Sequence, residues 1–475
     1  MGVKLLIILG SLIWSLTMIK SGWIYDYGMG FWGPNGHDGV WHIALANGLA
    51  RSSLEMPIFA GEQIKNYHIG FDLFLAALHK ITTIPTHNLY FQILPPLFAL
   101  TIGILVWKLT NSFWSVFFIY FGGNWAWILG KGESTLWAQQ AISTLINPPF
   151  ALSLILLFAG MLCLKHKKDF WAVIFFSLLP QVKIYGGILA LAALLINKNY
   201  KVFIFSVILS ALLFLPLNTG AQKLIEWRPG WFLETLFAPD RLDWPKFFSA
   251  LNTYRSGSIL IKGMLAYTVA LTIFLVGNFG TRLIGLFKAN DRFSLTIIIL
   301  GIIFPMLFVQ KGTTWNTIQF FYYSQVFLGL SAGLVMTKWP KWLNILIMLV
   351  TIPTTIDTMK HYLPSRPPAM VSKSELVSLE NLKKLPMGIV LTRPVTKSAG
   401  LEPRPLYIYE STAYVSAFTN KPVYMEDEVN LNITGFDWQE RRQEMSDYFT
   451  QPTLDFLIKH NIKYVYSNGA INITN

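Results

Sequence analysis

Residues 33–42, with the sequence GPNGHDGVWH, hold the densest group of side chains that could do chemistry. Gly and Pro predict a turn, and a helix is expected to begin near Asp38, with His42 one turn later on the same face. An ionised aspartate in this position can accept a proton from a hydroxyl group. Asp38 is therefore a candidate proton acceptor, and His37 and His42 are candidate ligand-binding residues beside it.

Asp38 also has an explanation without chemistry. Acids are favoured in the first turn of a helix because they interact with the helix dipole. The same helix carries Trp41, Leu45 and Leu49 at helical spacing, which predicts an apolar stripe lying on the bilayer surface. Both explanations of Asp38 are compatible with this stripe.

A second amphipathic helix is expected at Tyr67–Ile81, too short to span a membrane. Its His68, Asp72 and His79 share one helical face. His68 is a further candidate sugar ligand. A divalent cation such as Mg, Mn or Zn is conceivable here, although scattered interfacial histidines usually bind none. The residues that such a cation could use are His37, Asp38, His68 and Asp72.

Two further candidates lie in the segment 130–147, Glu133 and Asn147. Asn147 could hydrogen-bond a sugar or order the acceptor. It could equally cap the helix that Pro148 opens, since Asn is favoured at the N-cap and Pro in the first turn. Glu133 is assigned to the same sugar or acceptor site.

A lysine interrupts the apolar sequence after Pro180, in the run Lys183-Ile184-Tyr185. A charged residue near the bilayer centre costs roughly 3 kcal/mol on insertion scales and is a functional candidate by default. The alternative is a lysine that extends to the headgroups. Lys183 and Tyr185 are predicted to bind the phosphate of a lipid donor.

Cations and polar groups recur in two later segments, 218–258 and 310–319, and suit a phosphate that needs charge-assisted donors. The predicted phosphate ligands there are Arg228, Arg241, Arg255 and Lys311. The predicted sugar or acceptor ligands are Trp315, Asn316 and Gln319.

These residues are positioned by long apolar blocks. The 475 residues are 53% hydrophobic and only 13% charged, against about 25% charged in an average soluble domain. The pattern predicts an all-α polytopic membrane protein with about 11 transmembrane helices. The predicted spans are Val3–Met18, Asn88–Trp107, Phe113–Leu129, Pro148–Leu164, Phe170–Leu179, Ile184–Ile196, Val202–Leu217, Ile259–Phe279, Leu295–Val309, Ile318–Met336 and Trp342–Ile356.

Basic residues orient the spans through the positive-inside rule. A cytoplasmic N-terminus places the short basic turns inside and the long segments that hold the candidate residues outside. The turns predicted to be cytoplasmic hold Lys108, Lys165–Lys168, Lys198 with Lys201, Arg282 with Lys288 and Arg292, and Lys338 with Lys341. This arrangement also explains the net charge of +13 without nucleic acid.

The tail has ordinary soluble composition, so we expect a transmembrane domain at 1–357 and an extracytoplasmic α/β domain at 358–475. Strands are predicted at Gly388–Thr392, Thr412–Thr419 and Lys463–Tyr466. Helices are predicted at Trp438–Phe449 and Leu454–His460.

The order of these features resembles the GT-C superfamily of membrane glycosyltransferases. The resemblance rests on a first span, an outer Gly/Pro turn, an acid, a helix ending in Arg51-Ser52, the segment 56–61 (MPIFAG) and a second amphipathic helix. The superfamily includes protein O-mannosyltransferases, the aminoarabinose transferase of lipid A and oligosaccharyltransferases. The resemblance implies a donor linked to polyprenyl phosphate and makes Asp38 the catalytic base. Segment 413–424 resembles the outer domain of bacterial multispan glycosyltransferase-like proteins.

The resulting hypothesis is an inverting glycosyltransferase of the cell membrane. Asp38 deprotonates an acceptor hydroxyl on a glycan, lipid or protein, and cations such as Lys183 and Lys311 meet the departing phosphate. Two alternatives stay open. The break near Pro180 suits a flippase-like transporter of lipids or lipid-linked sugars, and the tail suits a non-catalytic membrane assembly protein.

Overall fold

The computed structural model describes residues 2–218, 220, 224–257, 260–288, 291–394, 404–405, 411–467 and 469–473. The chain is mostly helical and divides into two compact units. The bundle unit comprises Met1–Ser15, Pro96–Leu215 and Lys223–His361. The loop–tail unit comprises Leu16–Pro95, Pro216–Gln222 and Tyr362–Asn475. Residues Leu16–Pro95 therefore share a compact unit with the tail.

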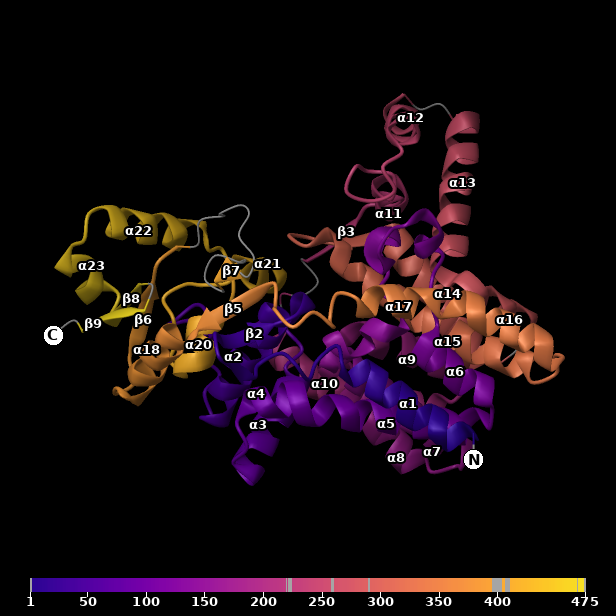
Figure 1. The fold of residues 1–475 in the computed structure, drawn as a ribbon, viewed down its shortest axis with the longest axis horizontal. Coiled ribbons are helices and arrows are strands. Elements are labelled where there is room, and N and C mark those ends of the chain that lie inside the picture. The colour runs from indigo at the N-terminus through magenta and orange to yellow at the C-terminus, as the bar shows by residue number, and fades with distance from the viewer. Residues whose placement is uncertain are drawn as a thin grey trace. The chain divides into compact units, whose positions relative to one another are not determined.

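The bundle unit consists almost entirely of helices, labelled in Figure 1. They are α1 (Gly2–Ser15), α5 (Leu94–Thr110), α6 (Phe113–Phe121), α7 (Pro148–Lys165), α8 (Asp169–Val182), α9 (Ile184–Ile196), α10 (Tyr200–Phe214), α11 (Trp231–Thr235), α12 (Pro245–Ser256), α13 (Leu260–Phe279), α14 (Arg292–Leu307), α15 (Gln319–Met336), α16 (Lys341–Thr351) and α17 (Pro353–Met359). The strands β3 (Ile225–Trp227) and β4 (Phe308–Gln310) pair antiparallel in the same unit.

Within the described residues, six helical segments are long and apolar enough to cross a membrane, and the chain is a membrane protein. They are Thr86–Thr110, Pro148–Lys165, Tyr200–Leu217, Ile261–Lys288, Thr314–Met336 and Lys341–Met359. Four shorter apolar helices accompany them, at Gly2–Ser15, Asp169–Val182, Ile184–Ile196 and Arg292–Leu307. The total of about 11 spans and their orientation stay predictions.

Two predicted spans have different limits in the structure. The segment expected to be helical from Phe113 to Leu129 ends its α-helix at Phe121, because Gly122 leaves the helical conformation (φ −53°, ψ 120°). The segment expected to end at Phe279 continues as helical turns to Lys288. Arg282, predicted to lie in a cytoplasmic turn, is only 2% exposed; the side of the membrane on which it lies stays a prediction.

Close helix packing in the bundle unit depends on small residues. A side chain at Gly301 on α14 would collide with Ser324 and with the Phe320 carbonyl group of α15. A side chain at Gly333 on α15 would collide with the backbone of α6 at Ser115. Small residues at such crossings let helix backbones approach closely inside a membrane.

The loop–tail unit combines helices with two small sheets. Its helices are α2 (Asp38–Ala50), α3 (Gly70–Thr82), α4 (Thr86–Asn88), α18 (Lys373–Lys384), α20 (Tyr414–Thr419), α21 (Glu428–Thr434), α22 (Gln439–Thr450) and α23 (Leu454–Lys459). One sheet has the order β1 (Ile24–Tyr25), β2 (Gly28–Phe31), β5 (Ala369–Ser372), β7 (Arg404–Pro405). The other has the order β6 (Ile389–Thr392), β8 (Ile462–Ser467), β9 (Ala470–Ile473). Strand β2 pairs antiparallel with β5, so the tail and residues 16–95 share a sheet.

Helix α2 begins at Asp38, as the sequence predicts, but it does not expose an apolar stripe. Trp41, Leu45 and Leu49 are all buried, because α2 packs against α3 and against α20 of the tail. The prediction that these three side chains lie on the bilayer surface is wrong. Helix α3 does expose apolar side chains, at Leu73, Phe74 and Ile81.

The tail elements follow the predictions except at Thr412–Thr419. Strands β6 and β8 and helices α22 and α23 lie where the sequence places them. The segment predicted as a strand forms the helix α20 instead. The backbone N–H groups of Val415 and Ser416 donate to the buried Glu426 carboxylate, a tertiary contact that favours a helix over the β-branched composition.

Candidate active site

Asp38 belongs to a chain of three ionisable side chains in the loop–tail unit. His37 Nδ1 lies 2.9 Å from Asp38 Oδ1, and His37 Nε2 lies 3.3 Å from Asp427 Oδ1. The Asp38 side chain is 47% exposed, whereas that of Asp427 is fully buried. One imidazole therefore bridges an accessible carboxylate and a buried one.

Asp427 is fixed in place by the helix that it starts. It adopts a left-handed backbone conformation, with φ 59°, which Asp tolerates better than most residues. Its side chain accepts hydrogen bonds from the backbone and side-chain N–H groups of Asn430, at 3.1 and 2.8 Å. These bonds satisfy the N-terminus of α21 and hold the carboxylate against His37.

The two carboxylates keep His37 positively charged. Burial alone would lower the pKa of His37, but Asp427 and Asp38 on either side raise its pKa well above the usual 6.5. A protonated imidazole donates from both nitrogens, so it can hold the Asp38 carboxylate in one orientation.

His42 does not join this group directly. Its Nδ1 lies 2.7 Å from Asp72 Oδ1 on α3, and its ring stacks on Tyr90 with centroids 5.8 Å apart. Both His42 and Asp72 are buried. The pair joins α2 to α3. The His68 ring stacks on the ring of its neighbour Tyr67.

The donor set around Asp38 does not fit the predicted cation. His37 already contacts Asp38 and Asp427, whose carboxylates raise its pKa, and a histidine must be neutral to bind a metal. The Asp72 carboxylate is already paired with His42. Among the described residues, no group of three or more His, Cys, Asp or Glu side chains could hold a metal ion.

Lys183 lies at the break between two short helices of the bundle unit. Helix α8 contains Pro180 and ends at Val182, and α9 begins at Ile184. The extended backbone of Lys183 (φ −156°) joins them. The side chain is buried, and its Nζ donates to Asn147 Oδ1 at 3.3 Å.

Asn147 is the N-cap of α7. Its Oδ1 accepts the backbone N–H of Phe150 at 3.1 Å, and Pro148 opens the helix. The capping alternative predicted for Asn147 is therefore observed, and its contact with Lys183 adds a second task. A role of Asn147 in binding a sugar stays a prediction.

Polar side chains from another part of the bundle unit extend from Tyr185. Its hydroxyl donates to Gln310 Oε1 at 3.3 Å, and Asn316 Nδ2 donates to the same oxygen at 2.8 Å. Gln319 in turn donates to Asn316. Lys311 follows Gln310 directly and is exposed. The structure thus brings Tyr185, Asn316 and Gln319 together through Gln310, while Trp315 is exposed.

The three predicted arginines do not gather at Lys183. Arg255 pairs with Glu234 at 2.6 Å. Arg241 stacks on Trp137 at 3.8 Å and donates to the Ser134 carbonyl group. Arg228 is exposed and follows Trp227, the last residue of β3. Lys311 lies at the other end of the β3–β4 pair. Arg241 and Arg255 thus have partners within the protein.

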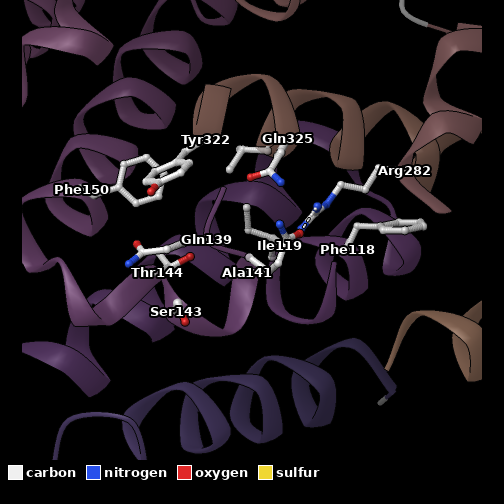
Figure 2. A pocket seen from close by; sticks show the side chains of 12 residues that line it. Phe118, Ile119, Gln139, Ala141, Ser143, Thr144, Phe150, Arg282, Tyr322 and Gln325 are labelled. Carbon is white, nitrogen blue, oxygen red and sulfur yellow. Dashed lines mark hydrogen bonds between the residues drawn. The ribbon is translucent and has the colours of Figure 1, made fainter. Parts of the chain in front are cut away.

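Glu133 forms part of a buried polar group in the bundle unit. Its carboxylate accepts a hydrogen bond from Ser143. Burial raises the pKa of Glu133 to about 7, although Ser143 and the Arg282 guanidinium oppose that shift. Arg282 Nη1 donates to Gln140 Oε1 at 2.8 Å (Figure 2), and its Nη2 donates to the Gly122 carbonyl group.

Asp427, Gln310 and Arg282 were missed by sequence reasoning. Asp427 precedes a short helix, which signals an N-cap but not a partner 390 positions away. Arg282 follows an apolar block, where a basic residue indicates a cytoplasmic turn. Only the tertiary structure shows that its guanidinium is buried.

Comparison with solved structures assigns the fold. The oligosaccharyltransferase of Archaeoglobus fulgidus, tethered with an acceptor peptide containing the NVT sequon, matches with a TM-score of 0.50 and 13% identity over 98% of this chain and 68% of that chain. The archaeal oligosaccharyltransferase AglB from Archaeoglobus fulgidus, in complex with an inhibitory peptide and a dolichol-phosphate, matches with a TM-score of 0.52 and 11% identity over 98% of this chain and 69% of that chain. The chain has a GT-C fold.

A third structure with this GT-C fold, the A. fulgidus oligosaccharyltransferase in complex with Zn and sulfate, matches with a TM-score of 0.52 and 14% identity over 97% of this chain and 67% of that one. No family model and no curated protein matches the sequence. The likeness is thus one of fold, at identities too low to transfer individual residues.

Proposed function

We propose that this chain is a membrane glycosyltransferase that moves a sugar from a polyprenyl-phosphate carrier to a hydroxyl acceptor on the outer face of the membrane. The observation that carries the proposal is the half-exposed Asp38 carboxylate held by the buried His37, in a chain with a GT-C fold. An accessible base with a fixed orientation is what abstraction of a hydroxyl proton requires.

In the proposed reaction, Asp38 accepts the proton of the acceptor hydroxyl. The hydroxyl oxygen forms a bond to the anomeric carbon of the donor sugar while the bond from that carbon to the phosphate oxygen breaks. The phosphate leaves with the bonding electron pair, and a single displacement inverts the anomeric centre. His37 orients Asp38 by donating from Nδ1.

The bundle unit supplies cations suited to the leaving phosphate. Lys183 is buried and donates to Asn147, the cap of α7. Lys311 is exposed next to the hydrogen-bonded group around Gln310. Fixed positive groups stabilise the charge that develops on a departing phosphate, usually a large part of catalysis.

The structures of similar fold support the substrate classes. One contains a dolichol-phosphate, a lipid phosphate, and another an acceptor peptide. A protein acceptor is therefore the first to test, followed by glycans and lipids. The third contains Zn, so the assay includes an arm with a chelator.

The direct test uses purified protein in lipid vesicles with a radiolabelled polyprenyl-phosphate sugar and candidate acceptors. Labelled acceptor that requires the protein supports the proposal. Movement of the labelled lipid across the bilayer without product would instead identify a transporter. Neither product nor movement, with all three acceptor classes present and with Mg, Mn or Zn supplied, would contradict the enzyme proposal.

A further inference from the structure

Helix α3 of the loop–tail unit turns its apolar side outward. Leu73, Phe74 and Ile81 are exposed, and spacings of seven and eight residues place Ile81 on the same helical face as the other two. Asp72, the only acidic residue of α3, is buried and paired with His42. A surface helix of a soluble domain has the reverse arrangement, with its apolar side chains toward the core. The outward face of α3 therefore suits an apolar partner.

A short link joins α3 to a segment that can cross the membrane. The helix ends at Thr82, and the apolar segment Thr86–Thr110 begins four residues later. Four residues of extended chain cover at most about 14 Å. The link is held in place, because His79 Nδ1 donates to the Ile84 carbonyl group at 2.7 Å and α3 packs against the first turns of the apolar segment. The end of α3 thus lies close to the level at which the chain enters the bilayer.

Lysines from two parts of the chain lie beside this junction. Lys80 on α3 is exposed and donates to the Ser52 hydroxyl group, which is neutral. Lys383, near the end of the tail helix α18, lies close enough to His87 for its charge to act on that imidazole. Because His87 is the second residue of the segment Thr86–Thr110, the end of α18 lies at the start of that segment.

These positive charges are poorly compensated within the protein. Lys384, the last residue of α18, is exposed, and among the residues that the structure describes it pairs with no acid. Lys383 lies 3.8 Å from Glu380, but both side chains are about half exposed, and an exposed pair of this kind is weak. The junction therefore presents a net positive surface.

An apolar helix face with lysines at its rim matches the chemistry of an anionic bilayer surface. The apolar face of such a helix enters the boundary between headgroups and acyl chains by about 5–10 Å. Lysines beside it attract anionic headgroups and extend to their phosphates. The short link to the segment Thr86–Thr110 favours the bilayer as the partner over a second copy of the chain, since it keeps α3 close to the lipid.

We propose that α3 and the end of α18 form a docking surface for anionic phospholipids of the bilayer in which the chain resides. The three exposed apolar side chains of α3 enter the headgroup boundary, and Lys80, Lys383 and Lys384 bind the lipid phosphates. This contact holds the loop–tail unit against the membrane. The surface does not rest on the proposed transferase activity, because none of its residues belongs to the candidate active site.

The test measures how close Ile81 lies to lipid chains in the full-length protein. In a Cys163→Ser background, which removes the single cysteine, Ile81→Cys carries an environment-sensitive fluorophore. The protein is placed in nanodiscs of phosphatidylcholine and phosphatidylglycerol, one of which bears a quenching spin label on its acyl chain. Ile458→Cys on α23 is the matched control, since Ile458 is 68% exposed against 80% for Ile81 and α23 lies well apart from α3 (Figure 1).

The label at position 81 should be quenched more strongly than the label at position 458, and more by spin-labelled phosphatidylglycerol than by spin-labelled phosphatidylcholine. Lys384→Glu should lower this preference about fivefold, the factor expected for one surface charge. Lys373→Glu, at the opposite end of α18 and equally exposed to solvent, should leave it unchanged.

Three results would overturn the proposal: equal quenching at the two positions, no preference for phosphatidylglycerol, or a preference that survives Lys384→Glu. Blue-shifted emission at position 81 without quenching by either lipid would also overturn it, because a second copy of the chain or another protein would then cover α3.

Discussion

At the scale of single residues, His37 is the group on which the candidate active site is built. It is buried between Asp38 and Asp427: its Nδ1 is hydrogen-bonded to Asp38, and its Nε2 lies 3.3 Å from Asp427 Oδ1. Buried charges are stable only when they are paired. The arrangement thus couples the accessible carboxylate to the tail, and it can be tested through its dependence on pH.

Replacing Asp427 by Asn should reduce the stability supplied by the His37 charge. The raised pKa of His37 contributes stability that is complete below about pH 6.5 and is lost as the pH rises through the folded-state pKa. Asn keeps the helix cap but removes one carboxylate. The melting temperature of Asp427→Asn should therefore fall below that of wild type most at pH 6, with a smaller difference at pH 9. An equal difference at both pH values would contradict the pairing.

Glu133 should also make the wild type less stable as the pH rises. Its raised pKa, about 7, means that the wild type loses stability as the pH rises from 4.5 to 7, when the buried carboxyl must ionise. Glu133→Gln cannot ionise and still accepts from Ser143. The melting temperature of the variant relative to wild type should rise between pH 5 and pH 8. A fall over this range would show that the Glu133 charge is stabilising, through Arg282.

At the scale of elements, the helix break at Lys183 followed directly from the sequence. Pro180 cannot continue the hydrogen bonding of a helix, and α8 ends two residues later. The start of α7 followed equally from Asn147 and Pro148. The helical conformation of α20 did not follow from the sequence, because it depends on Glu426, a tertiary partner that local composition does not indicate. The buried stripe of α2 was missed for the same reason, since α3 and α20 cover it.

Asn147 has two roles that substitutions can separate: it caps α7, and it accepts a hydrogen bond from Lys183. Asn147→Ala should cost about 1 kcal/mol of stability through the lost cap. Asn147→Asp keeps the cap and should restore the melting temperature, but its negative charge would neutralise Lys183. If Lys183 binds the donor phosphate, transfer activity stays low in Asn147→Asp although stability recovers. Full recovery of activity in this variant would argue against a phosphate at Lys183.

At the scale of the whole molecule, the composition was sufficient to predict a polytopic membrane protein, because only lipid-facing helices tolerate so little charge. The long helices confirm that conclusion. The contact between His37 and Asp427 could not be predicted from the sequence. The two residues are brought together by a tail that shares a sheet with residues 28–31. The predicted domain boundary at 357–358 and the orientation in the membrane stay predictions.

The orientation is open to a test because the chain has a single cysteine, Cys163. In a Cys163→Ser background, Asp437→Cys in the tail should react with a membrane-impermeant maleimide on intact cells. His166→Cys, in the predicted cytoplasmic turn, should react only after permeabilisation. Both positions are exposed, so accessibility depends on the side of the membrane. The reverse pattern would place the tail in the cytoplasm.

Transfer by the Asp38→Asn variant tests the central claim most directly. Asn preserves the shape of the side chain but cannot accept the proton, so transfer from a radiolabelled polyprenyl-phosphate sugar should fall about 100-fold or more, in protein that stays folded and inserted in the membrane. Asp26→Asn, an exposed aspartate of the same segment, is the matched control and should transfer at the wild-type rate. An Asp38→Asn variant as active as the control would contradict the account.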